Sequence, residues 1–195
     1  MALTFAHSTA GSLLYEATRP AGLHRPVLLG AAVAFANAAD LDFVPGILVG
    51  HPAEWHRGVT HTALAAVVVA ALVFVVVRLW GRPRRIAARS ALFAGAAWAS
   101  HVLIDFFTVD SQGHGAPYLW PFSSARYGAS RPLIGETVID PSGVGPFLAS
   151  LVTPHALGVW AHELVFLLGA IFVVHGVRVL IARAAPPVSG LPEGS

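Results

Sequence analysis

Residues 62–80 form a nearly unbroken apolar run, and this run limits what the chain can fold into more than any other feature. A run of about 20 apolar residues is long enough to cross the hydrocarbon core of a bilayer as one helix. Charged residues make up only 11% of the 195 positions, and 55% are hydrophobic. Soluble domains are about 25% charged. The sequence therefore predicts an integral membrane protein.

We expect an all-α, polytopic fold with about four to five membrane-embedded helices in one domain, residues 1–183. Two of the apolar segments, 2–18 and 27–40, are too short to span about 30 Å as straight helices, so they are expected to be tilted or partial. The Gly-, Pro- and Ser-rich stretch 110–153 is expected to be a long extracytoplasmic loop, and 184–195 a disordered tail. The five segments are 2–18, 27–40, 62–80, 86–109 and 158–182.

The N-terminus lacks the basic region and the uninterrupted apolar core of a removable signal peptide. We therefore expect His7 to stay in the mature protein. The chain also contains no cysteine, so it has neither disulfides nor thiolate ligands. Any metal ion must be held by imidazole and carboxylate groups.

Arginine supplies all the basic side chains, because the sequence contains no lysine. Five arginines lie in "RLWGRPRRIAAR", between two of the apolar segments. Loops rich in basic residues stay in the cytoplasm, so this linker is expected on the cytoplasmic side. The basic character is then explained by topology and lipid headgroups, and the expected partner is the lipid bilayer and no nucleic acid. The sequence does not define the oligomeric state.

The same topology places most of the other ionisable residues at the opposite, extracytoplasmic ends of their segments. Ionisable groups inside or beside a bilayer are costly, so several at one depth suggest a shared buried partner. A metal ion is the simplest such partner. These residues are His7, Asp40, Asp42, His56, His61, His101, Asp105, His162 and Glu163.

In "HVLID", His101 and Asp105 are four residues apart, so on a helix they project from one face. They can hold one ion between them. A hydrogen bond that satisfies both buried groups explains the spacing equally well.

In "HRGVTH", His56 and His61 converge only if His56 lies in the loop before the helix, which Gly58 permits. Thr60 is then expected to be the N-cap of the helix. Arg57 adds a fork for an anion such as phosphate. The alternative is a solvated polar cap at the membrane interface.

In "ADLDFVPG", Asp40 and Asp42 cannot share a helix face, but Pro45 and Gly46 suggest that the helix ends there. Both carboxylates could then turn toward one ion. Carboxylate with imidazole favours zinc, or else manganese, over calcium. The alternative is an acidic turn at the surface.

"AHEL" places Glu163 at the outer start of the last apolar segment. The stretch lacks the second histidine of the zinc protease motif HExxH, so the sequence does not indicate a protease of this type. Glu163 is a candidate general base or ligand, with solvation at the interface as the alternative.

Taken in order, these motifs and the later "WPFS" resemble the YdjM-type family of predicted membrane-bound metal-dependent hydrolases. The resemblance covers roughly residues 1–123. It departs from the family at Ala39, where proline is usual before the first aspartate. It implies an integral protein of the plasma (inner) membrane. It also implies a metal site, with Arg57 beside it and with Thr108 and Trp120-Pro121-Phe122 as framework. The implied ligands are His7, Asp40, Asp42, His56, His61, His101 and Asp105.

The resulting hypothesis is a hydrolase in which one or two divalent ions, zinc or else manganese, activate water. Arg57 and the start of the following helix would hold an anionic oxygen, which suits a phosphoester or lipid-linked substrate. Two alternatives stay open. One is a metal carrier or sensor without catalysis, and the other is a structural membrane protein whose polar residues only cap helices.

Overall fold

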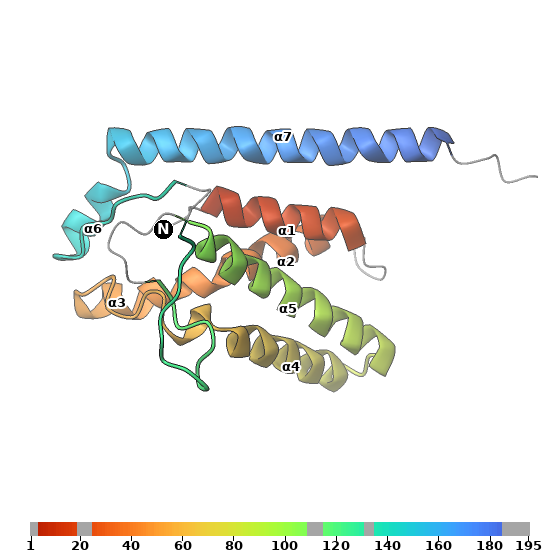
Figure 1. Ribbon diagram of the computed structural model, residues 1–195. Coiled ribbons are helices and arrows are strands. Elements are labelled where there is room, and N and C mark those ends of the chain that lie inside the picture. Colours follow the sequence, from red (N-terminus) through yellow and green to blue (C-terminus); the bar gives the residue numbers. More distant parts are fainter. Residues whose placement is uncertain (1–3, 19–24, 109–114, 131–134, 185–195) are drawn as a thin grey trace, which may run out of the picture.

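The computed structural model describes residues 4–18, 25–108, 115–130 and 135–184. Within these ranges the chain is mostly helical and contains no strand beyond one isolated bridge, between Ala116 and Tyr127. The long helices run back and forth, roughly along one direction (Figure 1). Positions 109–114, and the tail from residue 185 on that was expected to be disordered, lie outside the described residues.

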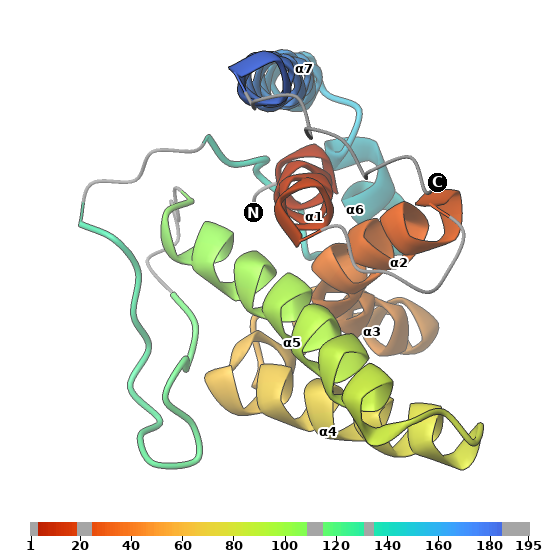
Figure 2. The same cartoon turned by 90° about the vertical axis from the view of Figure 1, so that its right-hand side faces the viewer.

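Four helices build the part of the bundle that positions the polar residues: α1 (Thr4–Thr18), α2 (Arg25–Asn37), α4 (Ala63–Leu79) and α5 (Arg84–Phe106). α1 packs against α2, α2 against α5, and α4 against α5. α7 (Pro154–Ala184) lies along α1 on the outside of the bundle (Figures 1 and 2).

Small residues let these helices approach closely. α5 buries a row of alanines at Ala87, Ala91, Ala94 and Ala97, spaced three or four residues apart. A side chain added at Gly95 would bring its Cβ within 2.9 Å of the Ala70 Cβ in α4. Close packing through small residues is typical of helices within membranes. The alanine face of α5 continues into His101 and Asp105, so the same packing holds both polar side chains in the interior.

Two helices in the described residues are long and apolar enough to cross a membrane. One is Pro154–Ile181, and the other is the continuous run Arg25–Val49. The second run joins α2, a 3₁₀ helix η1 (Ala38–Asp42) and α3 (Phe43–Val49). α4 is apolar but shorter. The expected total of four to five embedded helices stays a prediction.

One sequence expectation about a helix end is wrong. Pro45 and Gly46 do not end the helix, because both lie inside α3. Proline is tolerated there since the first turn of a helix needs no intrahelical N–H donor. The stretch 110–153 includes one short helix, α6 (Val144–Ser150), and its expected place as an extracytoplasmic loop stays a prediction.

Candidate metal centre

Four elements bring their polar residues to one end of the bundle. The first turn of α1 supplies His7, and η1 supplies Asp40 and Asp42. The turn before α4 supplies His56 and, in the short 3₁₀ helix η2 (Val59–His61), His61. The last turns of α5 supply His101 and Asp105. Seven of the nine residues expected to converge therefore do so, with these elements meeting at the left of Figure 1, whereas His162 and Glu163 lie in the last helix, outside this group.

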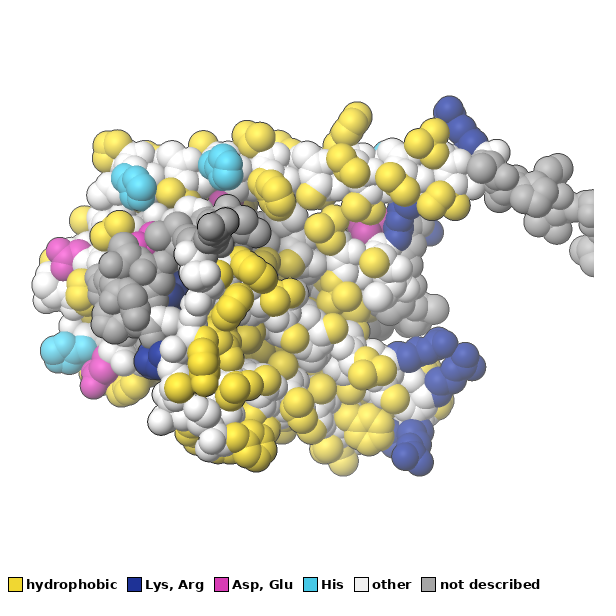
Figure 3. Space-filling model, in the orientation of Figure 1, with side chains coloured by type: hydrophobic (Ala, Val, Ile, Leu, Met, Phe, Trp, Pro, Cys, Tyr) yellow, Lys and Arg dark blue, Asp and Glu magenta, His cyan; other side chains and the backbone are white. Residues whose placement is uncertain are grey.

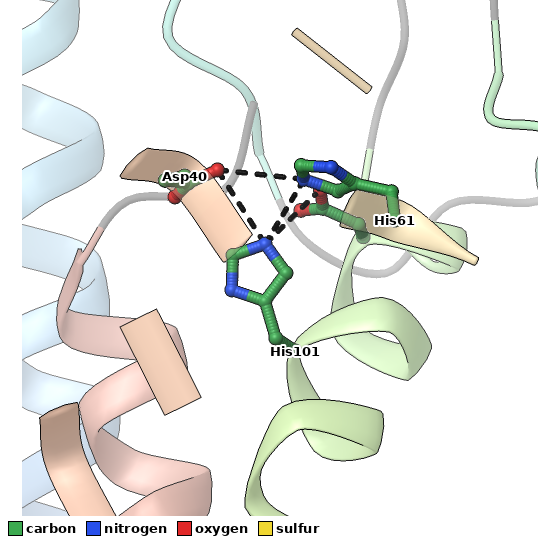
Figure 4. Close-up of side chains that lie close together, drawn as sticks. Asp40, His61 and His101 are labelled. Carbon is green, nitrogen blue, oxygen red and sulfur yellow. Dashed lines mark hydrogen bonds and ion pairs between the residues drawn. The ribbon is translucent and has the colours of Figure 1, made fainter. Parts of the chain in front are cut away.

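Asp40, His61, His101 and Asp105 form a group of four, with one potential ligand atom from each within 4.8 Å of every other. Figure 4 shows how Asp40, His61 and His101 point toward one another. The two Nε2 atoms of His61 and His101 are 3.1 Å apart. The Nε2 atom of His61 lies 3.2 Å from Asp105 Oδ2 and 3.5 Å from Asp40 Oδ1. The Nε2 atom of His101 lies 3.6 Å and 3.4 Å from the same two oxygens.

These spacings fit a tetrahedral ion. Zinc binds nitrogen and oxygen at about 2.0–2.2 Å, so neighbouring ligand atoms in a tetrahedron are about 3.3–3.6 Å apart. The five separations that involve a histidine Nε2 run from 3.1 to 3.6 Å. His61, His101 and Asp105 are at most 2% exposed. Oδ1 of Asp40 and both oxygens of Asp105 are buried without a hydrogen-bond partner in the described structure, as expected of atoms that need a cation.

The outer nitrogens of the two histidines make hydrogen bonds that aim their Nε2 atoms into this group. His101 Nδ1 lies 2.8 Å from the backbone oxygen of Ala36, to which it can donate. His61 Nδ1 lies 3.2 Å from Asp42 Oδ2 and 3.0 Å from the hydroxyl of Thr60. A histidine that donates through Nδ1 keeps its Nε2 lone pair for a metal, which is the usual arrangement behind metal ligands.

Asp42, His56 and His61 form a second group that shares His61 with the first. Asp42 Oδ1 lies 3.1 Å from His56 Nδ1, and its Oδ2 accepts a hydrogen bond of 2.8 Å from Thr60. One neutral imidazole offers a single lone pair, so His61 cannot serve an ion in each group. The geometry therefore favours Asp42 as the residue that orients His61. The predicted roles of Asp42 and His56 as ligands stay predictions.

His7 stacks on His101, with ring centroids 3.7 Å apart and an angle of 16° between the planes. Its Nε2 atom is 3.5 Å from Asp105 Oδ1, the oxygen that does not face His61. His7 is fully buried. It therefore borders the four-residue group without belonging to it, and its expected role as a ligand is untested.

Burial and neighbouring carboxylates shift the two loop histidines in opposite directions. Burial lowers the pKa of His56, although its hydrogen bond to Asp42 acts against this. Burial also disfavours a proton on His61, but the close carboxylates of Asp105, Asp40 and Asp42 prevail and raise the pKa of His61 well above its usual value. The surroundings of His61 thus favour positive charge, whether a proton or a metal cation supplies it.

Arg57 is buried beside this centre, with its Nε atom 3.9 Å from Asp105 Oδ2. Its backbone has φ = 56°, a left-handed conformation that costs free energy in residues other than glycine. Such strain is found mainly where the surrounding structure holds a functional residue in place. Here Arg126 provides part of the hold, because its guanidinium donates a 3.1 Å hydrogen bond to the backbone oxygen of Arg57.

A cavity of about 1390 Å³ opens beside Asp42, His56 and Arg57. Its walls combine charged side chains, including Arg126, with apolar ones from η1, the loop before α4, and α5. The apolar residues include Leu41, Pro45, Trp55, Val59 and Trp98. The cavity can therefore receive a ligand that has both a polar and an apolar part.

Glu163 lies apart from the metal-ligand groups. Its Oε2 atom accepts a 3.1 Å hydrogen bond from the backbone N–H of Ala6, an amide in the first turn of α1. The side chain is only 3% exposed, so the alternative of simple solvation is wrong. Its contact stabilises the start of the helix that carries His7. A catalytic role for Glu163 stays a prediction.

The start of α4 differs from the sequence expectation. The N-cap is Thr62, whose hydroxyl accepts a hydrogen bond from the backbone N–H of Ala65, and the assignment of Thr60 as the cap is wrong. Thr60 lies two residues earlier, in η2, where its hydroxyl donates a hydrogen bond to Asp42. His61 thus precedes α4 and is not in its first helical turn.

Several supporting residues were missed by sequence reasoning. Trp98 donates a 2.8 Å hydrogen bond to the backbone oxygen of Thr60, and Phe43 stacks on His56 with ring centroids 3.9 Å apart. Arg126 was not considered. For these residues the sequence offered one signal, which is the position of Trp98. It lies three residues before His101 and therefore on the same side of the helix. Thr108, expected as framework, is buried and bonds the backbone oxygen of Ile104.

Comparison with known proteins adds the family. Residues 1–183 match the family described as YdjM inner membrane protein. The chain belongs to this family. It is therefore a membrane protein, and the resemblance seen in residues 1–123 is confirmed over a longer stretch. No solved structure matches this YdjM-family chain.

A curated relative agrees. This YdjM-family chain is 34% identical over 145 residues to the inner membrane protein YbcI of Escherichia coli (strain K12). The match covers 72% of this chain and 76% of the relative. Both names place the proteins in the inner membrane, and neither states an activity.

Proposed function

We propose that this protein is a membrane-embedded, metal-dependent hydrolase whose ion is held by Asp40, His61, His101 and Asp105. The observation that carries the proposal is the close approach of four ligand atoms, all within 4.8 Å of one another, in which each histidine Nε2 lies 3.1 to 3.6 Å from the other three atoms. Two imidazoles and two carboxylates match the ligand preferences of zinc, with manganese as the second choice.

When bound, such an ion supplies Lewis-acid activation of water and of the substrate oxygen. The residues of the chain then have separate tasks. Asp42 holds His61 in the orientation that presents Nε2, and the backbone oxygen of Ala36 does the same for His101. Arg57 brings a fixed positive charge beside Asp105, where it can stabilise an anionic substrate.

A phosphoester, free or linked to a lipid, is the substrate class that best suits this site. Arginine pairs readily with phosphate oxygens, and Arg57 is both beside the proposed ion and in the wall of the cavity. The apolar part of that wall suits a lipid-like portion of the substrate.

We place the site on the extracytoplasmic side of the membrane. Arginines gather at the end of the bundle opposite the candidate centre, as the dark blue side chains at the right of Figure 3 show. Basic ends of membrane proteins remain in the cytoplasm. The cavity beside Arg57 then opens toward the outer surface, where lipid headgroups are available.

The test measures hydrolysis of a panel of phosphodiesters and phospholipids. The purified protein is first loaded with zinc or manganese and then reconstituted into lipid vesicles. We expect metal-dependent turnover that is abolished in Asp105→Asn and retained in Asp140→Asn, whose side chain is exposed. Glu163→Gln keeps an oxygen that can accept from Ala6, so loss of turnover in this variant would assign Glu163 a catalytic role.

The alternatives predict other results. A protein that binds stoichiometric metal but hydrolyses nothing in the panel supports the carrier or sensor function. A protein that binds no metal supports a structural function.

A further inference from the structure

A hairpin projects from the helices between α5 and α6. Reciprocal backbone hydrogen bonds of 3.0 Å between Ala116 and Tyr127 close its base. Its tip turns tightly, with the backbone N–H of Trp120 bonded to the oxygen of Pro117 and that of Phe122 to the oxygen of Leu119. The hairpin is thus an ordered structure that holds its tip in a defined place.

The tip is apolar and exposed. Phe122 is 95% exposed, Leu119 54% and Trp120 41%. The sequence "YLWPFSSA" that forms the tip contains no charged residue. Several neighbouring large apolar side chains with no cover are unusual on a surface that faces water, and they indicate contact with another phase or molecule.

Backbone hydrogen bonds fix the hairpin beside the start of α4 and the end of α5. The backbone N–H of Ala63, the first residue of α4, donates a 3.0 Å hydrogen bond to Tyr118. Ala129 donates one of 2.9 Å to Phe106, the last residue of α5. The hairpin lies outside the bundle beside these two helices (Figure 2). Further along α4, Val67 and Leu72 are 63% and 59% exposed, so the uncovered apolar surface begins directly beyond the hairpin.

We infer that the tip, Leu119, Trp120 and Phe122, inserts into the interfacial layer of the bilayer at the end of the molecule that carries the candidate metal centre. Tryptophan is enriched at this depth because its ring is apolar while its N–H needs a polar partner. Phenylalanine and leucine at the boundary bury apolar area below the headgroups. Continuity with the exposed apolar face of α4 identifies the occupant as lipid.

The base of the hairpin is also bonded to the residue beside the candidate metal centre. Arg126, at its base, donates 3.1 Å hydrogen bonds to the backbone oxygens of both Gly115 and Arg57. The tip is therefore connected through Arg126 to Arg57, the residue with the left-handed backbone beside the candidate centre. Insertion of the tip sets the depth of Arg57, and of the cavity that it lines, relative to the membrane surface.

The absence of cysteine makes a direct test available. Single-cysteine variants Phe122→Cys, Val67→Cys and Ser142→Cys would carry a nitroxide label in vesicles of phosphatidylethanolamine and phosphatidylglycerol. Collision of each label with oxygen, which enters lipid, and with a water-soluble nickel complex reports depth. Val67 marks the lipid-facing wall, and exposed Ser142 marks water.

We expect a label at 122 to show an oxygen-to-nickel accessibility ratio several-fold above that at 142 and closer to that at 67. A ratio equal to that at 142 would overturn the inference. Low access to both reagents would overturn it in favour of a protein partner or a second copy. Leu119→Cys repeats the test if Phe122→Cys does not fold. The accessibility to oxygen and to the nickel complex depends neither on bound metal nor on hydrolysis, so this test can fail while the proposed function holds.

Discussion

Asp42 differs from Asp105, the other buried acidic residue of the candidate centre, in its hydrogen bonds. It lies within 3.2 Å of His56, His61 and Thr60 at once, whereas both oxygens of Asp105 have no hydrogen-bond partner in the described structure. A carboxylate that is already satisfied orients a ligand, and one that is not satisfied binds the ion. This contrast separates two kinds of acidic residue that the sequence presents alike.

We expect Asp42→Asn to weaken zinc binding by about 10–100-fold, since the amide cannot accept hydrogen bonds from all three neighbours. Asp105→Asn should remove stoichiometric binding altogether. Competition with a chelating dye measures both affinities, with Asp140→Asn as the control. Equal losses in Asp42→Asn and Asp105→Asn would contradict the division of roles.

Arg57 allows the backbone and the side chain to be tested separately. Arg57→Gly and Arg57→Ala both remove the guanidinium, but only alanine keeps the cost of φ = 56°. Arg57→Gly should therefore be more stable than Arg57→Ala by about 1 kcal/mol. Thermal unfolding in detergent compares the two, and a glycine variant that is the less stable would show that the backbone is not strained.

For single residues, the sequence predicts which side chains share a helix face better than it predicts where side chains in turns point. The four-residue interval of His101 and Asp105 places both side chains on one face of α5, because a regular helix leaves little choice. The directions of Asp40 and Asp42 could not be predicted, since they depend on a 3₁₀ turn whose course is set by packing. The left-handed backbone of Arg57 has no sequence signal at all.

Among the elements, the helices are held together mainly through small residues. In α1, a Cβ at Gly11 would lie 2.6 Å from the backbone oxygen of Ala32 in α2, so the two backbones touch there. In α7, by contrast, a Cβ at Gly169 would meet nothing within 4 Å. The same residue type is thus required in one helix and optional in the other.

Gly11→Ala should destabilise the protein by about 1–3 kcal/mol, because helix α1 must move away from α2. Gly169→Ala should be neutral or stabilise by up to about 1 kcal/mol, since alanine forms helix better than glycine. Denaturant unfolding in mixed micelles measures the pair. A harmless Gly11→Ala would mean that α1 and α2 are not closely packed.

Helix positions could be predicted from apolar runs, but their ends could not. The segments expected at 62–80 and 86–109 correspond to α4 and α5 within a few residues. The segment expected at 158–182 begins four residues earlier, at Pro154, because proline fits the start of a helix. α6 was missed because seven residues carry too little periodicity to be recognised.

For the molecule as a whole, the polar residues divide between two ends. The arginines of the turn between α4 and α5 lie at one end, and the candidate centre lies at the other (Figures 1 and 3). A single-cysteine variant at exposed Glu54, near the candidate centre, should react with a membrane-impermeant maleimide in spheroplasts, whereas Arg84→Cys should react only after lysis. The reverse pattern would place the candidate centre in the cytoplasm.

The central claim is that Asp40, His61, His101 and Asp105 hold one metal ion in this membrane protein. Elemental mass spectrometry of the protein purified in detergent and reconstituted with metal tests it most directly, with the wild type beside His101→Ala/Asp105→Ala and Asp140→Asn. Circular dichroism should show that each variant remains folded. We expect about one equivalent of zinc or manganese in the wild type and in Asp140→Asn, and none in the double variant. A folded wild type that binds no metal, or a double variant that retains it, would contradict a metal site at these four residues.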